Sequence, residues 1–410
     1  MTTRPLNPVA LKSQVVNFRA LPPLSLYIHV PWCVRKCPYC DFNSHEVRGA
    51  PSPLGVEGGL QPSLERQYVA ALVRDLELAL PQIWGRKVYT VFFGGGTPSL
   101  LSGEAVAEIL RNVRMLLPLD LNAEVTLEAN PGTVEAARFA AYREAGVNRL
   151  SLGIQSFNDV HLQALGRIHT GDEARRAIGV AQEHFDNINL DLMYALPGQT
   201  LEEALQDVQT ALAFAPQHLS CYHLTLEPNT LFYLNPPPLP DDDVSAGMQE
   251  HIEAMLEAQG YQHYETSAFA RPRQRARHNL NYWQFGDYLG IGAGAHSKLS
   301  FPDKVVRQAR YKQPQAYMRQ AAEGKPLQEE HEISPDDLGF EFMMNALRLN
   351  DGFEATLFEE RTSLSLLGIR HELEDAEKKG LLHRDFQRIA PTASGQRFLN
   401  DLLQIFLRNG

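Results

Sequence analysis

The feature that most constrains the fold is an alternation of β-rich runs with helical patterns over the first two thirds of the 410-residue chain. The β-rich runs cover residues 24–30, 88–93, 124–129, 148–154, 187–194 and 218–226. Strands and helices that alternate in this way form a parallel sheet with right-handed crossovers. Six units are fewer than the eight of a closed barrel, so we predict an α/β fold with a partial (β/α)6 barrel. A doubly wound open sheet is the alternative, and periodicity does not separate the two.

Helical spacing marks the connections between these runs. Leucines and a tyrosine recur at every fourth position from Leu64 to Leu80, which predicts a helix that begins after Ser63 and ends at Pro81. Two more helices are predicted over residues 102–117 and 133–145, with Ser102 and Thr133 as their N-caps.

The pattern changes in the last third of the chain. From about Ala270 the alternation stops, a Gly-rich stretch covers residues 286–294, and mostly helical sequence follows. The C-terminal end is typical of a helix, a short hairpin and a helix, as in a small winged-helix-like unit. We therefore expect an N-terminal extension (1–23), a barrel (24–270) and a mostly α C-terminal domain (271–410).

Composition excludes several classes of protein. With 38 basic and 49 acidic residues the net charge is −11, a field that repels a phosphate backbone, so no nucleic-acid partner is expected. No apolar run reaches the roughly 18 residues of a membrane helix, so we expect no transmembrane segment. The N-terminus has no apolar stretch typical of a secretion signal, which predicts a cytoplasmic protein.

Three of the four cysteines, Cys33, Cys37 and Cys40, lie within eight residues at the end of the first run. This clustering is typical of thiolate metal ligands in a reducing compartment and not of a disulfide framework. Three thiolates can bind a four-iron cluster and leave one iron open to another molecule. Spacing alone also allows a structural zinc site with His29 or His45 as the fourth ligand.

The spacing Cys-x3-Cys-x2-Cys, with Tyr39 before the last cysteine, resembles the radical S-adenosylmethionine (SAM) superfamily. The resemblance extends from about Leu24 to the C-terminus, because further motifs follow on successive predicted strands. They are Gly94-Gly95-Gly96-Thr97-Pro98, Glu128-Ala129-Asn130-Pro131, Gln155-Ser156-Phe157 and the segment from Asp191 to Gly198. Within the superfamily, the chain is most similar to the branch of the oxygen-independent coproporphyrinogen III oxidases and the HemW heme chaperones, and closest to the latter.

The resemblance implies a 4Fe-4S cluster on Cys33, Cys37 and Cys40. It also implies that SAM is contacted by Tyr27, Tyr39, Gly95, Gly96, Thr97, Glu128, Gln155, Arg167 and Asp191. These residue types suit the ligand: glycines admit it close to the backbone, Glu128 accepts hydrogen bonds from ribose hydroxyls or an ammonium, and Arg167 binds a carboxylate.

Two features divide this branch. The oxidases resemble the chain but have a fourth cysteine where this chain has Phe42, which argues against decarboxylase activity. The chaperones share an HNxxYW motif, matched by His278, Tyr282 and Trp283, and the resemblance implies that these residues bind heme. Imidazole is a common axial ligand of heme iron, and aromatic rings offer flat faces to a porphyrin. Without that context, a histidine such as His278 is more often a surface or core residue than a ligand.

The function expected from this resemblance is a heme chaperone that carries a 4Fe-4S cluster, SAM and heme, delivers heme to an acceptor hemoprotein, and is not itself an enzyme. A homodimer is possible. The alternatives are the oxidase, which uses a SAM-derived radical to decarboxylate coproporphyrinogen III, and a radical enzyme with another substrate.

Four smaller signals stay open. Residues 290–295 mimic a dinucleotide fingerprint, but no βαβ unit starts there, so we expect a close turn against the cofactor cavity. His296, at the end of this turn, either contacts a tetrapyrrole or has a structural role. Cys221 is expected to be a buried thiol. The basic run 271–277 is either a solvated loop or a partner for heme propionates.

Overall fold

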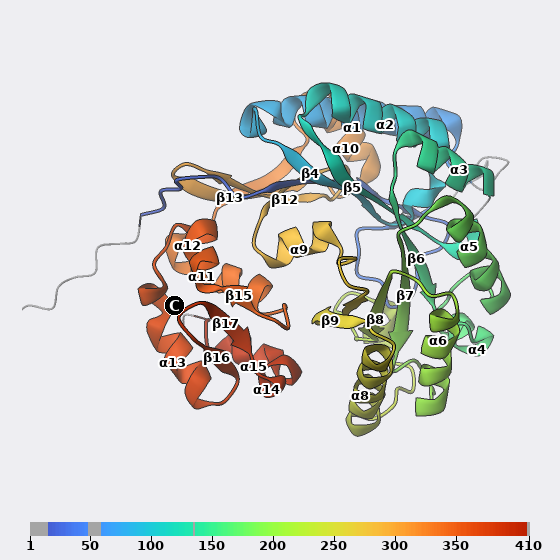
Figure 1. Cartoon of the computed structure of the whole chain (residues 1–410). Coiled ribbons are helices and arrows are strands. Elements are labelled where there is room, and N and C mark those ends of the chain that lie inside the picture. Colours follow the sequence, from blue (N-terminus) through green and yellow to red (C-terminus); the bar gives the residue numbers. More distant parts are fainter. Residues whose placement is uncertain (1–14, 48–58, 134–135, 408–410) are drawn as a thin grey trace, which may run out of the picture.

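The central element of the fold is a 12-stranded sheet, seen in a computed structural model that describes residues 15–47, 59–133 and 136–407 (Figure 1). Six of its strands are parallel and adjacent in chain order: β1 (Leu24–Val30), β4 (Val88–Gly95), β5 (Leu119–Ala129), β6 (Arg149–Gln155), β7 (Ile188–Tyr194) and β8 (His218–His223). These are the six predicted runs. The predicted α/β class with an open, barrel-like arrangement is confirmed, because the sheet ends in two edge strands and does not close.

Antiparallel strands extend this sheet at both edges. On one side β11 (Asp287–Ile291) is parallel to β1, and the antiparallel strands β12 (His296–Phe301), β13 (Lys304–Arg310) and β14 (Leu327–Glu332) follow. On the other side lie β10 (Ala268–Ala270) and β9 (Gln262–Glu265). The prediction of mostly helical sequence after residue 294 is wrong for β12 to β14. A Pro302-Asp303 turn joins β12 to β13, and the sheet thus runs past residue 270.

Helices cover the outer face of the sheet (Figure 1). They are α1 (Pro62–Ile83), α2 (Gly103–Leu116), α3 (Ala136–Ala145), α5 (Gly171–His184), α6 (Leu201–Ala213), α8 (Asp242–Ala258) and α10 (Pro314–Ala322). The core lies between these helices and the strands, where side chains such as Leu26, Ile28 and Val91 are fully buried. The short helices α4 (Asp159–Ala164) and α7 (Leu231–Leu234) occupy connections.

Helix boundaries follow the sequence with small differences. The predicted cap of α2 is confirmed, since the Ser102 hydroxyl accepts a hydrogen bond from the Ala105 amide at 3.1 Å. Helix α1 begins two residues earlier than predicted, with Gln61 and not Ser63 at the N-cap, because Pro62 is favoured at the first helical position. It also continues through Pro81 to Ile83, whose side chain is buried in the core. The start predicted for α3 involves residues 134 and 135, which lie outside the described residues.

One short helix, α9 (Arg277–Trp283), lies on the inner face of the curved sheet (Figure 1). It packs against β1, β4 and β11, and also against α11 (Pro335–Ala346) of the C-terminal part. Helix α9 carries the HNxxYW motif, so the fold places this motif inside the sheet's hollow and not on the outer surface.

The C-terminal part has a hydrophobic core of its own, which includes Phe342, Phe358 and Leu402. Its helices are α11 (Pro335–Ala346), α12 (Ala355–Thr362), α13 (Arg370–Lys378), α14 (Ala393–Arg397) and α15 (Leu399–Gln404), and its small sheet consists of β15 (Phe353–Glu354), β17 (Arg388–Pro391) and β16 (Leu382–Arg384). The predicted order of helix, hairpin and helix is present.

The predicted N-terminal extension is described only from residue 15, where Val16 and Phe18 pack into the C-terminal core, and residues 1–14 lie outside the described residues. No described helix is long and apolar enough to cross a bilayer.

Candidate functional site

The three clustered cysteines lie in a loop at the carboxyl end of β1. The loop is closed by two short parallel strands, β2 (Trp32–Cys33) and β3 (His45–Glu46). The Asn43 amide anchors it by donating hydrogen bonds to the carbonyls of Ala293 and Lys312, each at 2.9 Å. All three thiols are free and partly buried. Burial raises the pKa of Cys33 and of Cys40, so binding a metal centre as thiolates would require these groups to lose their protons.

The cysteines share one cavity, of about 390 Å³, with the ends of the parallel strands. Besides the three cysteines, the cavity is lined by these residues predicted to contact SAM: Tyr39, Gly95, Gly96, Thr97, Glu128, Gln155, Arg167 and Asp191. The residues that line it come from the ends of β4, β5, β6, β7 and β8, from the cysteine loop and from the loops that follow these strands. Its volume lies in the range of small-molecule sites.

Gly95 and Gly96 fit the end of β4 tightly against the cysteine loop. Gly95 has a φ of +114°, a conformation that side chains other than glycine rarely adopt. A Cβ atom on Gly96 would lie 2.5 Å from the carbonyl oxygen of Trp32, next to Cys33. Both positions therefore require glycine, and they keep the backbone open toward the cavity.

Two carboxyl groups, those of Glu128 and Asp191, line the same cavity. Burial and the neighbouring Asp191 raise the pKa of Glu128 to about 8, against a hydrogen bond from the Gly95 amide that lowers it. Burial also raises the pKa of Asp191, which accepts hydrogen bonds from Ser151 and Asn189, both at 2.8 Å. The two carboxyl groups lack a positive charge beside them, and a cationic ligand such as a sulfonium or an ammonium would stabilise their charged forms.

Arg167 links the strand ends to the cysteines. Its guanidinium donates to the Gly153 carbonyl at 2.9 Å and to the Cys37 sulfur at 3.6 Å. It also donates to the Asn130 side chain. The guanidinium is therefore placed to bind a ligand carboxylate and to offset negative charge on the cysteine sulfurs.

Sequence reasoning missed the residues that hold the charged side chains of the site in place. Ser151 and Asn189 hold Asp191, and Asn130 holds Arg167. A usable signal existed, because Ser151 and Asn189 are polar residues inside otherwise apolar parallel strands, where a polar side chain needs a partner.

Tyr27 is the one predicted SAM contact that does not line this cavity. It lines a larger neighbouring cavity, of about 930 Å³, which shares Cys40, Gly95 and Glu128 with the first. The Tyr27 hydroxyl forms a hydrogen bond with His29 Nδ1 at 3.0 Å, and His29 Nε2 with the Asn43 carbonyl at 2.9 Å. Both ring nitrogens of His29 are thus occupied.

The fit of the cysteines to a metal centre rests on their common cavity. Among the described residues, no three His, Cys, Asp or Glu side chains converge on a position for a single metal ion. A structural zinc site would need a histidine as its fourth ligand. Because both ring nitrogens of His29 are occupied, His45 is the remaining candidate, and its Nε2 lies 3.3 Å from the Lys312 carbonyl.

The heme motif on α9 is placed differently from the SAM residues. The His278 side chain is 3% exposed, its Nδ1 lies 2.8 Å from the Thr90 hydroxyl, and its ring stacks on Phe92 at 4.9 Å. Its backbone amide donates to Glu124 at 3.0 Å. Burial, with the nearby cation of Arg149, lowers the pKa of His278 to about 3. Within the described chain, His278 Nε2 has no hydrogen-bond partner.

The other two motif residues point in different directions. Tyr282 reaches the larger cavity, where its ring stacks on Tyr288 at 4.2 Å. Trp283 packs under the guanidinium of Arg348, 4.4 Å from the ring centre, and it lines neither of the two cavities. Heme contact by His278 and Trp283 stays a prediction.

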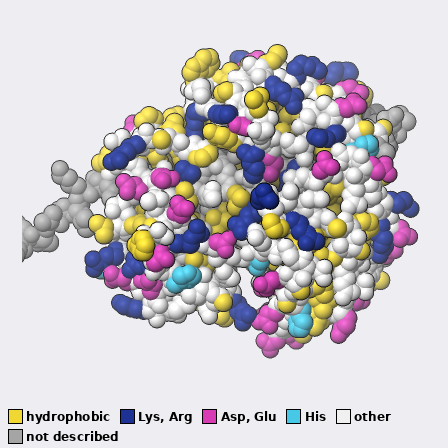
Figure 2. Space-filling model, viewed as in Figure 1, with side chains coloured by type: hydrophobic (Ala, Val, Ile, Leu, Met, Phe, Trp, Pro, Cys, Tyr) yellow, Lys and Arg dark blue, Asp and Glu magenta, His cyan; other side chains and the backbone are white. Residues whose placement is uncertain are grey.

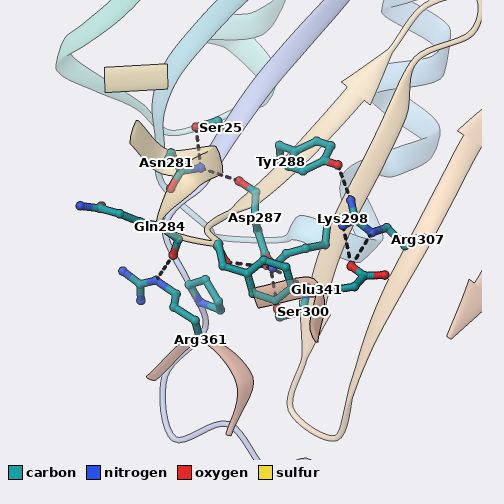
Figure 3. A network of polar contacts seen from close by, with 12 residues as sticks. Ser25, Asn281, Gln284, Asp287, Tyr288, Lys298, Ser300, Arg307, Glu341 and Arg361 are labelled. Carbon is teal, nitrogen blue, oxygen red and sulfur yellow. Dashed lines mark hydrogen bonds and ion pairs between the residues drawn. The ribbon is translucent and has the colours of Figure 1, made fainter. Parts of the chain in front are cut away.

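A buried polar network fixes this wall of the larger cavity (Figure 3). Asp287 accepts from Lys298 at 2.9 Å and pairs with Arg86 at 2.8 Å. Arg307 binds both the Tyr288 hydroxyl and Glu341 of α11 (Figure 3). The network thus ties Tyr288 and its strand to the C-terminal part.

The smaller sequence signals have definite places. The turn at residues 290–295 lies against the cysteine loop, since a Cβ on Gly294 would lie 2.2 Å from Asn43. Cys221 is buried, which raises its pKa to about 12. In the basic run, Arg271 packs on Tyr261 at 4.2 Å and Arg275 pairs with Asp351 of the C-terminal part at 3.0 Å. Lys and Arg side chains gather around the hollow between the two parts (Figure 2).

Comparison with known proteins agrees with this geometry. The model of the radical SAM superfamily matches residues 27–211, and that of the HemN C-terminal domain matches residues 333–398. A heme chaperone HemW of Escherichia coli is 48% identical over 94% of this chain and 99% of its own length. The HemW of Bacillus subtilis is 34% identical over 93% of this chain and 99% of its own length. The chain belongs to the HemW family of the radical SAM superfamily.

One solved structure resembles this chain over nearly its whole length. The coproporphyrinogen III oxidase (HemN) from Escherichia coli, a radical SAM enzyme, is 25% identical to this chain. The match has a TM-score of 0.77 and covers 94% of this chain and 90% of that one. The two proteins therefore share both the barrel-like part and the C-terminal part.

Proposed function

We propose that this protein is a heme chaperone that holds a 4Fe-4S cluster on Cys33, Cys37 and Cys40 and SAM in the adjoining cavity, and passes heme to an acceptor hemoprotein. The observation that carries the proposal is the single cavity in which the three thiols meet eight of the nine predicted SAM contacts. A cluster bound there would supply an open iron for the amino and carboxylate groups of SAM and an electron for its reductive cleavage. Near full-length similarity to heme chaperones supports heme as the cargo.

The chain's own residues would prepare this site. Arg167 would bind the ligand carboxylate. Glu128, whose pKa is raised, would lose its proton and become charged when a cation binds beside it. The Gly95-Gly96 backbone would lie against the ligand, because neither residue has a Cβ to block it.

The second candidate is the oxidase, and the likeness of the whole fold to HemN favours it. Phe42 argues against it, since this side chain stands where the oxidases have a fourth cysteine. It is 62% exposed and lines both cavities, so the position is open for a ligand or a partner and not filled by the core.

Metal analysis tests the cluster. After anaerobic reconstitution, the wild type should contain about four irons and four sulfides per chain. Alanine at Cys33, Cys37 or Cys40 should lower both contents severalfold, whereas Cys221→Ala serves as the matched control and should keep them. Stoichiometric zinc without labile sulfide would refute the cluster.

A combined assay then separates the chaperone from the oxidase. Heme is added to one portion of reconstituted wild-type protein, and coproporphyrinogen III with SAM and a reductant to another. Heme binding without consumption of coproporphyrinogen supports the chaperone. Its decarboxylation by the wild type would establish the oxidase instead.

A further inference from the structure

The cavity next to the cluster site has the size and position to take a large flat ligand. Its volume of about 930 Å³ lies at the upper end of the range for cofactor sites. It lies between the cysteine loop, the strand end of β1 and the turn that joins β11 to β12. Because it shares Cys40, Phe42 and Gly95 with the smaller cavity, a molecule bound in it would touch the cluster site directly.

Three histidines line this cavity, and they differ in what their rings can still bind. Both nitrogens of His29 are occupied by Tyr27 and Asn43, and His45 Nε2 lies 3.3 Å from the Lys312 carbonyl. Among the described residues, none forms a hydrogen bond with the ring of His296, whose side chain is exposed to the cavity. His45 keeps its Nδ1, and of the three histidines only His296 has both ring nitrogens without a hydrogen-bond partner among the described residues.

The environment of His296 also suits a heme. Lys312 lines the same cavity and provides a cation of the kind that pairs with propionates.

A flat aromatic wall completes the cavity. Tyr282 and Tyr288 stack at 4.2 Å with an angle of 24° between their planes. Arg307 holds the Tyr288 hydroxyl and is itself paired with Glu341, so the wall is fixed from behind (Figure 3). Aromatic faces of this kind pack well against a porphyrin.

His278 lies deeper along the strands than the cysteine loop does. The groups that hold it are Thr90, the third residue of β4, and Glu124, the middle residue of β5, whereas the cysteine loop follows the last residue of β1. Its side chain is 3% exposed and lines neither cavity. One helical turn later, Tyr282 does reach the cavity, and its ring lies 5.5 Å from that of His278.

We infer that His296 is the axial ligand of heme iron and that heme binds in this larger cavity against Tyr282 and Tyr288. His278 is then a positioning residue, which acts through α9 and Tyr282. This inference rests on the proposed function, since it names the site at which the chaperone would hold its cargo.

The test compares heme binding by four variants of the full, cluster-reconstituted chain. His296→Ala should weaken heme binding at least tenfold and change the Soret spectrum, and added imidazole should restore the wild-type spectrum. His296→Met should bind heme with a shifted spectrum, because a thioether replaces the imidazole on iron. His278→Ala should lower the melting temperature but, below it, give bound heme the wild-type spectrum. His371→Ala, at an exposed position on α13, is the matched control and should resemble the wild type.

The outcomes separate this inference from the proposed function. An unchanged spectrum in both His296 variants, with a spectrum lost in His278→Ala and restored by imidazole, would assign the ligand to His278 and overturn the inference alone. A wild type that binds no heme would overturn the chaperone function as well.

Discussion

At the residue scale, the site depends on two carboxyl groups whose ionisation is disfavoured before any ligand is present. Glu128 and Asp191 are carboxyl groups in one cavity, and the pKa of each is raised. Burying a charge without a partner is costly, so such a pair marks a place for a cation. In the free chain, hydrogen bonds from Ser151 and Asn189 hold the Asp191 carboxyl group in its orientation.

Replacing one of these carboxyl groups should affect SAM and not the cluster. Glu128→Gln should weaken SAM binding by about 1.5–3 kcal/mol, roughly tenfold to a hundredfold, because it removes a charge-assisted hydrogen bond. Isothermal titration measures the affinity, and iron analysis checks the cluster. Glu144→Gln, on the exposed side of α3, is the control. Equal affinities of the two variants would show that Glu128 does not contact the ligand.

The raised pKa of Glu128 also predicts a pH dependence. In the free chain this carboxyl is protonated below about pH 8, and a cationic ligand requires the charged form. Binding therefore releases a proton below that pH, and SAM affinity should rise as the pH increases toward 8. Titrations between pH 6.5 and 8.5 should show this slope in the wild type and a flatter one in Glu128→Gln. Parallel profiles would contradict the assignment.

At the scale of elements, the close approach of β4 to the cysteine loop decides the shape of the site. Gly96→Ala would place a Cβ 2.5 Å from the Trp32 carbonyl, so the loop must shift and iron retention should fall severalfold. Gly179→Ala in α5 is the matched control. Nothing lies within 4 Å of its Cβ, and alanine there should stabilise the helix by up to about 1 kcal/mol. Iron content and thermal melting measure both effects, and full iron retention by Gly96→Ala would count against the loop geometry.

The second element-scale prediction concerns the network around Asp287. Burial raises the pKa of this carboxyl, but Lys298 and Arg86 outweigh that effect and hold it below its usual value. Its contribution to stability is therefore present above the unfolded pKa of about 3.9 and is lost as the pH falls through the folded pKa. Asp287→Asn should cost about 3–5 kcal/mol at neutral pH, because it leaves Lys298 buried without its partner.

Urea unfolding between pH 3 and 7 measures this effect. The wild type should lose stability on acidification, and Asp287→Asn should lose less. Asp303→Asn, at an exposed position in the β12–β13 turn, should follow the wild type. If both substitutions cost less than about 1 kcal/mol, the network would not hold the wall of the larger cavity.

The sequence predicted the strands of the barrel-like part better than its edges. The parallel strands are mostly buried, and apolar residues recur in them at alternate positions, as Leu24, Leu26 and Ile28 do in β1, which periodicity detects. The edge strand β14 carries mostly exposed polar residues, and no apolar period marks it. Motif residues at strand ends were predicted to converge because parallel strands end at one edge. His278 could not be placed, because its burial depends on α9 turning into the hollow of the sheet.

At the scale of the whole molecule, the C-terminal part and the barrel-like part meet around the proposed heme cavity. Arg307 on β13 binds both Tyr288 on β11 and Glu341 on α11, and Arg275 pairs with Asp351. The wall of the cavity is thus shared between the sheet and the helices that follow it. A chaperone needs its cargo accessible to an acceptor, and a site at a junction of two parts suits such a transfer.

Heme transfer by the wild-type chain is the measurement that tests the central claim most directly. Cluster-reconstituted protein is loaded with heme, freed of excess heme and mixed with an apo-hemoprotein, and the spectra of both proteins are followed after separation. The account predicts about one heme per chain, which moves to the acceptor while the donor returns to its heme-free spectrum. A chain that takes up no heme, or one that keeps it while decarboxylating coproporphyrinogen III, would contradict the account.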